Sequence, residues 1–313
     1  MQQITTGIDH LHLTFSASHS LETIVTTLFT GITADHFRPS RKQQKWYRRT
    51  RLLQTTTGDT LAAFHSDSTS TFGRRNLLQV HGLAFSDSAL NALRPLNLQK
   101  LIDGAVELDA HVSEIDVYID DRSGLTPVNQ IYEQSLPHTY RDYIRSTFTK
   151  DHQGKPTLPD FYGGSSIYYG RRGRNFCKVL FYQKDLCPRQ RVYETGNRLK
   201  SPWIRYELKL RKGSAKKETD LLMKLSIPEF DAETPRLGEV VVDLFQRHFS
   251  YVVPGPRSSR RKLQSWWSEL LKRAALYNHI PLSDHTSCYH RPGISSLRTL
   301  DGNPQTDTLA FCL

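Results

Sequence analysis

The fold is indicated most directly by residues 203–211, which read Trp-Ile-Arg-Tyr-Glu-Leu-Lys-Leu-Arg. Apolar and charged residues alternate strictly here, which is the pattern of a β-strand with one face on a core. The charged face carries Arg205, Glu207, Lys209 and Arg211. We therefore expect a sheet with one apolar face and one face rich in charge.

Other segments extend this pattern. Residues 8–15, 77–82 and 107–120 alternate as strands, and residues 166–184 are predicted to form a basic turn that runs into a strand. Ser20 is a candidate helix N-cap. Helical spacing is also seen near 86–103 (broken at Pro95), 136–148, 214–226, 234–250 and 263–277, with a loop at 149–165 and a linker at 253–262.

This uneven mixture of strands and helices favours an α+β fold with a largely antiparallel central sheet flanked by helices. We expect this α+β domain to span residues 1–225. Residues 226–313 are expected to form a helical, basic C-terminal region.

The composition indicates the kind of partner. The 313 residues carry a net charge of +11, from 42 Lys and Arg against 31 Asp and Glu, so a polyanion is the expected partner. The four cysteines lack CxxC spacing, which fits a reducing cytosol. Because no signal peptide or membrane-length apolar run is visible, we expect a cytoplasmic protein with no membrane contact.

Two basic segments are predicted to contact nucleic acid. In residues 38–51, cations that include Arg48 and Arg49 surround Trp46 and Tyr47, which combines phosphate neutralisation with base stacking. A merely solvated charged face is the alternative. In the second segment we expect backbone contacts from Arg171, Arg172, Arg174 and Lys178, and base stacking from Tyr169.

The order of the motifs is more specific than any one of them. Ile-Asp-x-Leu-x-Leu-Thr at residues 8–14 precedes a strand ending at Gly82 and an Ile-Asp strand at residues 115–116. Tyr-Tyr-Gly at 168–170, Tyr-x-Lys at 182–184 and Trp-Ile-Arg-Tyr-Glu at 203–207 follow. This order resembles the rolling-circle replication initiators of filamentous phages, of the gene-two/gene-ten type, and the related Rep_trans plasmid initiators. The resemblance covers roughly residues 8–225.

The resemblance implies a metal-dependent, HUH-like endonuclease in a bacterial host cell. It implies that Tyr182 cuts one DNA strand, keeps the 5′ phosphate as a phosphotyrosine and leaves a free 3′-OH, with Lys184 assisting. Asp116, Glu207 and His81 would hold Mg²⁺ or Mn²⁺. Its implied partner is single-stranded or supercoiled origin DNA, and a dimer is a further expectation. The helix that carries Trp266 and Trp267 follows the linker at 253–262 and could dock a host helicase.

The residues alone leave alternatives open. Tyr182 could be a packing tyrosine of a half-buried strand, and either Tyr168 or Tyr169 could be a second nucleophile. Glu207 could pair with a neighbouring cation, and His81 could be a hydrogen-bonded turn residue. His10-Leu11-His12 has the spacing that names the HUH class, and one of its two imidazoles could reach the metal.

Three functional alternatives also remain open. A plasmid initiator or relaxase would use the same chemistry at a different origin. A non-catalytic binding protein for single-stranded DNA would keep the sheet and the basic loops, and it stays open because Glu114 and Gln183 depart from the usual motif. A basic RNA-binding protein would use its aromatic residues to bind unpaired bases.

Overall fold

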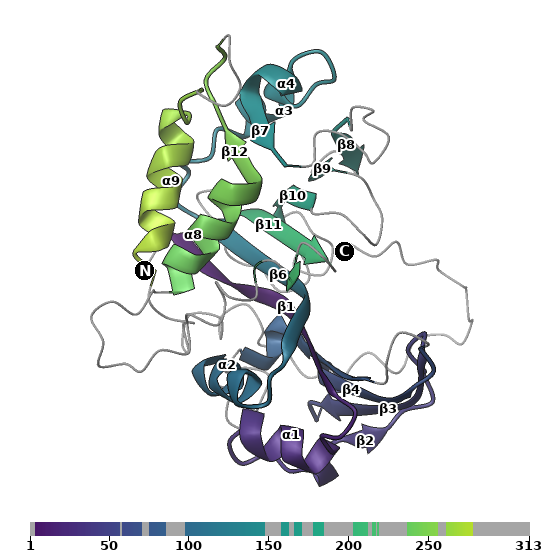
Figure 1. Ribbon diagram of the computed structural model, residues 1–313. Coiled ribbons are helices and arrows are strands. Elements are labelled where there is room, and N and C mark those ends of the chain that lie inside the picture. The colour runs from purple at the N-terminus through teal and green to yellow at the C-terminus, as the bar shows by residue number, and fades with distance from the viewer. Residues whose placement is uncertain are drawn as a thin grey trace, which may run out of the picture.

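Figure 1 shows the computed structural model of the chain. The structure describes residues 4–56, 58–70, 75–85, 98–147, 158–162, 166–170, 178–184, 203–211, 215–216, 218, 237–255 and 261–277. Several predictions concern segments outside these ranges, namely the first part of the helix at 86–103, most of the helix at 214–226, most of the loop at 149–165, and the domain boundary near residue 225.

Within the described residues, ten strands form one sheet whose neighbours are all antiparallel, which confirms the predicted sheet. The strand order is β2-β3-β4-β5-β1-β6-β11-β10-β9-β8. A small second sheet pairs β12 with β7. The strands are β1 (Ile4–Ser16), β2 (Arg38–Pro39), β3 (Tyr47–Gln54), β4 (Thr60–Ser68), β5 (Arg75–His81), β6 (His111–Asp121), β7 (Ile144–Ser146), β8 (Asp160–Tyr162), β9 (Ser166–Tyr169), β10 (Lys178–Gln183), β11 (Ile204–Arg211) and β12 (Phe249–Tyr251).

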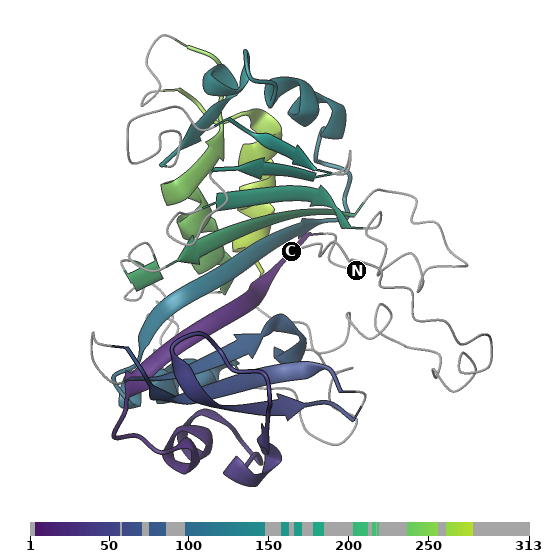
Figure 2. The same ribbon diagram turned by 90° about the vertical axis from the view of Figure 1, so that its right-hand side faces the viewer.

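The long central strands β1 and β6 connect the two halves of the molecule (Figure 2). Leu11 of β1 lies opposite Ile115 of β6, and both side chains are fully buried. On the other side of β6, Val117 lies opposite Leu208 of β11, again with both side chains buried. Opposite residues project from the same face, so the predicted alternation produces one continuous apolar face.

Helices pack against the apolar side chains of this sheet. In Figure 1, α1 and α2 lie beside the half that contains β2, β3 and β4, whereas α8 and α9 lie beside the other half. All four helices bury side chains in the same core cluster as β1. The helices are α1 (Leu21–Leu28), α2 (Leu98–Glu107), α3 (Val128–Gln134), α4 (Tyr140–Tyr143), α8 (Leu237–His248) and α9 (Ser265–Ala275), with 3₁₀ turns η1 (Ala34–His36) and η2 (Gly82–Phe85).

Helix α1 begins as its sequence predicts. The Ser20 side chain accepts a hydrogen bond from the backbone N–H of Thr23, which satisfies one of the unpaired donors of the first turn. Ile24, Val25 and Leu28 are buried on one face of the helix. The cap and the apolar stripe therefore agree on where this helix starts and which face it buries.

The predicted helix at 136–148 is wrong. Only the single turn of α4 forms within this segment before β7 begins. Residues Ile144–Ser146 pair with β12, a strand about one hundred residues later, so a long-range contact overrides the local helical spacing. Helix α3, before this segment, was not predicted, and β8 lies within the predicted loop at 149–165.

The predicted C-terminal helix is confirmed as α9, and its two tryptophans belong to the core. Trp267 is fully buried, and its ring lies 5.1 Å from the ring of Tyr206 and 5.2 Å from that of Tyr251. The partly buried Trp266 lies 4.9 Å from Tyr251. The tryptophan pair therefore holds α9 on the sheet. In the described part of the chain, no helix has both the length and the apolar character that crossing a membrane requires.

We predict that Gly238→Ala destabilises the protein, because α8 and α9 touch at this glycine. An added Cβ would lie 2.1 Å from the carbonyl oxygen of Ala274 and 2.8 Å from that of Tyr277. Both contacts are backbone atoms, so the helices must separate, at a cost of about 2 kcal/mol. Urea unfolding measures this change in stability. Gly255→Ala is the matched control, because its nearest contact would be an ordinary 3.7 Å, and equal stability of the two variants would contradict the prediction.

A candidate active site on the polar face of the sheet

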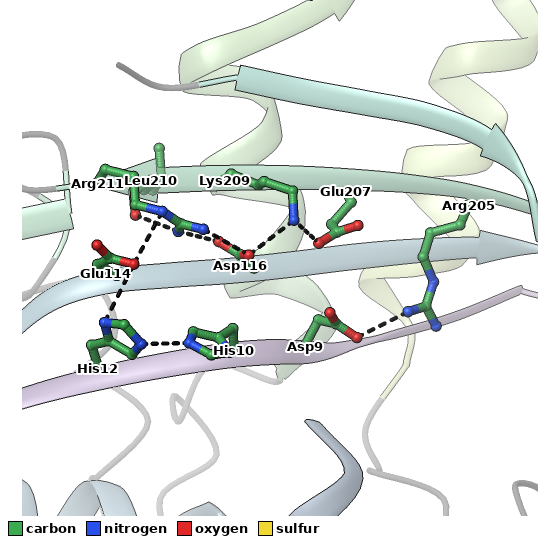
Figure 3. A network of polar contacts seen from close by, with 10 residues as sticks. All are labelled: Asp9, His10, His12, Glu114, Asp116, Arg205, Glu207, Lys209, Leu210 and Arg211. Atoms are coloured by element: carbon green, nitrogen blue, oxygen red, sulfur yellow. Dashed lines mark hydrogen bonds and ion pairs between the residues drawn. The ribbon is translucent and has the colours of Figure 1, made fainter. Parts of the chain in front are cut away.

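A row of polar residues crosses five strands on the face opposite the core. Successive register partners place His81 beside His10, His10 beside Asp116, Asp116 beside Lys209, and Lys209 beside Lys178. Directly opposite residues point to the same side of a sheet. Residues from β5, β1, β6, β11 and β10, distant in sequence, therefore gather in one cluster, part of which Figure 3 shows.

Three histidines meet at one end of this row. The Nε2 atoms of His10 and His12 lie within hydrogen-bonding distance of each other. The ring of His81 stands edge-on to that of His10, with ring centroids 4.6 Å apart. On the other side of its ring, His12 Nδ1 lies 3.3 Å from Glu114 Oε2. The carboxylate orients the His12 ring and leaves its Nε2 directed toward His10 (Figure 3).

These imidazoles are neutral near pH 7. Burial, together with the neighbouring His81, lowers the pKa of His10 to about 4. Burial, together with His10, lowers the pKa of His12 to about 2. The pKa of His81 is also lowered by burial. A neutral imidazole can bind a metal ion through its unprotonated nitrogen, whereas a charged imidazolium cannot.

The two predicted carboxylate ligands share a cation in this structure. Lys209 Nζ donates to Asp116 Oδ2 at 3.0 Å and also to Glu207 Oε1. Arg211 adds a second contact to Asp116, from Nη2 at 2.9 Å. Burial opposes ionisation of Asp116, but Lys209 and Arg211 outweigh it and lower its pKa to about 2. For Glu207 burial dominates and raises the pKa, although Lys209 opposes the change.

Asp9 occupies an irregularity in β1. The register between β1 and β6 shifts between Ile8 and His10, so Asp9 is the extra residue of a β-bulge. Gly82 fits against this bulge, since an added Cβ there would lie 3.0 Å from Asp9 Cα. The Asp9 carboxylate accepts from Arg205 Nη1 at 3.1 Å. This ion pair links β1, the strand that carries the histidines, to Arg205, which lies opposite Tyr182 in the pairing of β10 with β11.

Tyr182 lies on β10, which has β11 and β9 as its neighbouring strands. Its register partners are Arg205 on β11 and Ser166 on β9. The side chain is half-buried, and burial raises its pKa well above 10, while Arg205 acts in the opposite direction. The phenol is therefore protonated in the free protein, and it requires a positive environment to become a nucleophile.

Lys184 is more enclosed than its sequence suggests. Its ammonium lies 4.4 Å from the centre of the Trp203 ring and 3.9 Å from Asp120 Oδ2. Burial, followed by the repulsion of Arg205, lowers its pKa to about 8. A buried lysine with a pKa in this range can lose its proton near physiological pH.

The other residues that were predicted to contact DNA differ in how far they are exposed. Arg48 and Arg49 are exposed on β3, and Lys178 is half-buried at the end of the polar row. Tyr169 is 2% exposed, and its hydroxyl bonds to Ser135 at 2.5 Å and to Tyr251 at 3.0 Å. The alternation of β9 turns Tyr169 into the core, which removes it from the predicted DNA contacts. Arg171, Arg172 and Arg174 lie outside the described residues.

Four residues of this cluster, His10, His12, Arg205 and Asp9, are more central to it than their sequence context suggests. The His-x-His spacing of His10 and His12 was a visible signal, because alternate residues of a strand share a face. Arg205 was visible as a charged strand residue, but its position opposite Tyr182 depends on the pairing of β10 with β11. The bulge at Asp9 left no signal that could be read from the sequence.

The donor atoms around His10 and His12 fit a divalent cation in part. Two neutral imidazoles converge, a carboxylate orients one of them, and Asp116 lies opposite the other. Among the described residues, however, no three His, Cys, Asp or Glu side chains form a ready-made metal site. Further ligands would have to come from water, from DNA or from a carboxylate released by its cation.

Comparisons with known proteins agree with this fold. Residues 110–283, more than half of the chain, match the model of the Rep_trans family, described as replication initiation factor. The chain therefore belongs to the replication initiation factor family. The fold is similar to that of a rolling circle replication initiator protein from Geobacillus stearothermophilus, with a TM-score of 0.62 and 18% identity over 88% of this chain and 98% of that one. No curated protein matches the chain.

We predict that acidification destabilises the protein through its buried histidines. Their pKa is lower in the folded chain than the ordinary 6.5, so the unfolded chain binds protons first and stability falls as the pH decreases below about 6.5. For His10 this decline continues to about pH 4. His12→Gln should make the decline shallower by roughly 1 kcal/mol per pH unit.

Urea unfolding in EDTA between about pH 6 and pH 5 measures this slope. The control is His138→Gln, which changes an exposed side chain and should keep the wild-type slope. Identical slopes in wild type and His12→Gln would show that His12 is not held neutral by burial.

Proposed function

We propose that this protein initiates rolling-circle replication by nicking one DNA strand at an origin and later rejoining it. Tyr182 would be the nucleophile. The observation that carries the proposal is the Asp9–Arg205 ion pair, which joins Tyr182 and the His10–His12 pair in one polar cluster. Membership of the replication initiation factor family supports it.

The proposed reaction is a transesterification. The Tyr182 oxygen attacks the scissile phosphorus, a tyrosine–phosphorus bond forms, and the bond from phosphorus to the 3′ oxygen breaks. The phenol proton passes to solvent or to Lys184 in its neutral form, and the 3′ oxygen takes a proton from water. The DNA is left with a free 3′-OH, and its 5′ phosphate is joined to Tyr182. Because the phosphodiester energy is retained, rejoining needs no other energy source.

A divalent cation, Mg²⁺ or Mn²⁺, is part of the proposal. His10 and His12 are the residues best arranged to hold it, and the predicted ligands His81 and Asp116 adjoin His10. Glu207, the remaining predicted ligand, would have to exchange Lys209 for the metal. Once bound, the cation would polarise the scissile phosphate and offset its developing negative charge. The chain itself would supply the nucleophile and the orientation of the imidazoles.

The exposed cations of β3 form a second proposed DNA contact. Arg48 and Arg49 are both exposed, and beside them Trp46 is 58% exposed. The Lys45 ammonium lies 4.8 Å from the centre of the Trp46 ring. Such a surface can neutralise phosphates and stack on an unpaired base. Lys178, Arg171, Arg172 and Arg174 remain proposed contacts nearer to Tyr182.

The proposed setting is the cytoplasm of a bacterial host, with single-stranded or supercoiled origin DNA as the substrate. A host helicase and a second copy of the chain remain proposed partners. The tryptophans of α9 do not provide a helicase contact, because they pack in the core.

We predict that Tyr182→Phe abolishes nicking and leaves DNA binding intact, because phenylalanine keeps the ring and removes the nucleophilic oxygen. Protein is incubated with Mn²⁺ and a single-stranded pool covering the origin of its own replicon. A denaturing gel then detects a covalent adduct, and mass spectrometry maps the linked residue. EDTA should prevent adduct formation in the wild type.

Tyr168→Phe is the matched control, since Tyr168 lies on the adjacent strand β9, opposite Leu180 of β10. It should still form the adduct on Tyr182. An adduct on Tyr168 in the wild type would correct the assigned nucleophile. Tight binding of origin DNA without any adduct would instead assign the chain to the non-catalytic binding proteins.

We predict that Arg48→Ala/Arg49→Ala weakens DNA binding without changing the position of the nick. Each phosphate contact that the double variant loses should make the slope of log affinity against log salt shallower by about 0.9. Filter binding over a salt series measures the slope, and primer extension maps the nick. Arg247→Ala/Arg273→Ala removes two exposed arginines from α8 and α9 and is the control. An equal weakening in both double variants would mean that β3 makes no specific contribution.

A further inference from the structure

Arg205 lies where it can act on Tyr182 directly. The two residues are opposite one another in the β10–β11 pairing, so their side chains leave the sheet on the same face. Cross-strand partners have Cβ atoms only about 5 Å apart. Among the charges around Tyr182, the Arg205 guanidinium is the first that favours the ionised phenol.

Two carboxylates from different strands fix the guanidinium. Asp120 accepts from Arg205 Nε at 2.6 Å and from Nη2 at 2.7 Å, which is the bidentate geometry. Asp9, on the β1 bulge, accepts from Nη1 at 3.1 Å. These contacts use three of the five N–H groups of an arginine. The side chain is held in one orientation and keeps donors for a further oxygen.

Tyr118 supports the plane of the guanidinium. Arg205 Cζ lies 3.8 Å from the centre of the Tyr118 ring, in a cation–π contact. The Tyr118 ring in turn lies over Gly7 of β1, where an added Cβ would come within 2.6 Å of Tyr118 Cζ. The absence of a side chain at Gly7 therefore allows Tyr118 to lie flat beneath Arg205.

Lys184, the cation that the Tyr-x-Lys motif suggests, is less suited to supply constant charge. It lies over Trp203 and shares Asp120 with Arg205 at the longer distance of 3.9 Å. A lysine ammonium can lose its proton in such surroundings, whereas an arginine guanidinium stays protonated. The two side chains therefore suit different tasks, with a permanent charge on Arg205 and a transferable proton on Lys184.

We infer that Arg205 is the fixed cation that stabilises the Tyr182 oxygen as its proton leaves and as it joins the scissile phosphate. Asp120, Asp9 and Tyr118 hold Arg205 in place for this role. The inference rests on the proposed function, because it assigns a residue to the step that Tyr182 would perform. Arg205 forms no bond in that step, so the balance of atoms and protons given above is unchanged.

The test compares three proteins with the wild type. Arg205→Gln/Asp120→Asn removes both members of the buried pair, which avoids leaving Asp120 unpaired. Arg205→Lys keeps the positive charge and removes the planar guanidinium group with its paired N–H donors. Glu218→Gln/Arg247→Gln removes a carboxylate–arginine pair elsewhere and is the matched control. For each protein, the single-turnover rate of adduct formation is measured at saturating DNA, and the dissociation constant for DNA is measured separately.

We expect the double variant to bind DNA within about threefold of wild type but to form the adduct about 100-fold more slowly. Arg205→Lys should recover part of this rate, which a merely structural role of the guanidinium fork would not predict. The Glu218→Gln/Arg247→Gln control should react at the wild-type rate. Thermal unfolding verifies that the variants are folded under the assay conditions.

The result that overturns the inference is a wild-type rate in Arg205→Gln/Asp120→Asn while the wild-type protein forms its adduct on Tyr182. The inference is also overturned if the rate of the double variant falls only in proportion to its folded fraction and Arg205→Lys recovers none of that rate. Arg205 would then act only on stability. Failure of the proposed function looks different, since the wild-type protein itself would form no adduct on Tyr182.

Discussion

The three carboxylates on the polar face of β6 are each held by a cation of β11, and the arrangement of the site depends on this pairing. Arg211, Lys209 and Arg205 lie opposite Glu114, Asp116 and Asp120, respectively. A slip of one residue would turn all these charges toward the core and the apolar side chains toward the polar face. Ion pairing and apolar burial therefore specify the same register. Since β6 also pairs with β1, that register places His10 and His12 beside the acidic strand.

Burial and pairing together set the protonation states of the cluster. Asp116 and Asp120 remain ionised because neighbouring cations outweigh the cost of burial, whereas His10 and His12 are neutral because burial dominates. Burial disfavours the charged form of any group, so it raises the pKa of Tyr182 and keeps the phenol protonated. The same effect keeps the histidines neutral by lowering their pKa. Buried ion pairs are weak evidence for stability, because desolvation offsets most of their attraction. Their value here is the defined position and charge that they give to the arginine and lysine side chains around Tyr182.

Alternation was the most reliable guide in the sequence. It predicted the strands β1, β5, β6 and β11, although β1 begins four residues earlier and β6 four residues later than expected. It also predicted the face of every charged residue in residues 203–211. It was less useful where strands are short. Tyr169 was expected in a DNA-contacting loop, but the four-residue strand β9 turns it into the core. Likewise, helical spacing near residues 136–148 could not reveal that Ile144–Ser146 pairs with the distant β12.

The amino-acid pattern was enough to indicate an antiparallel sheet with one charged face, a basic protein suited to a polyanion, and the shared face of Tyr182 and Lys184. These properties are local, because each depends on a side chain's position within its own strand or on total charge. The neighbours of Tyr182 and His10 were decided only in three dimensions. The order β1-β6-β11-β10 brings Arg205 opposite Tyr182, and the bulge at Asp9, which fits against Gly82, links them to the histidines. Strand order and bulges arise from contacts between segments far apart in the chain, and no local periodicity encodes those contacts.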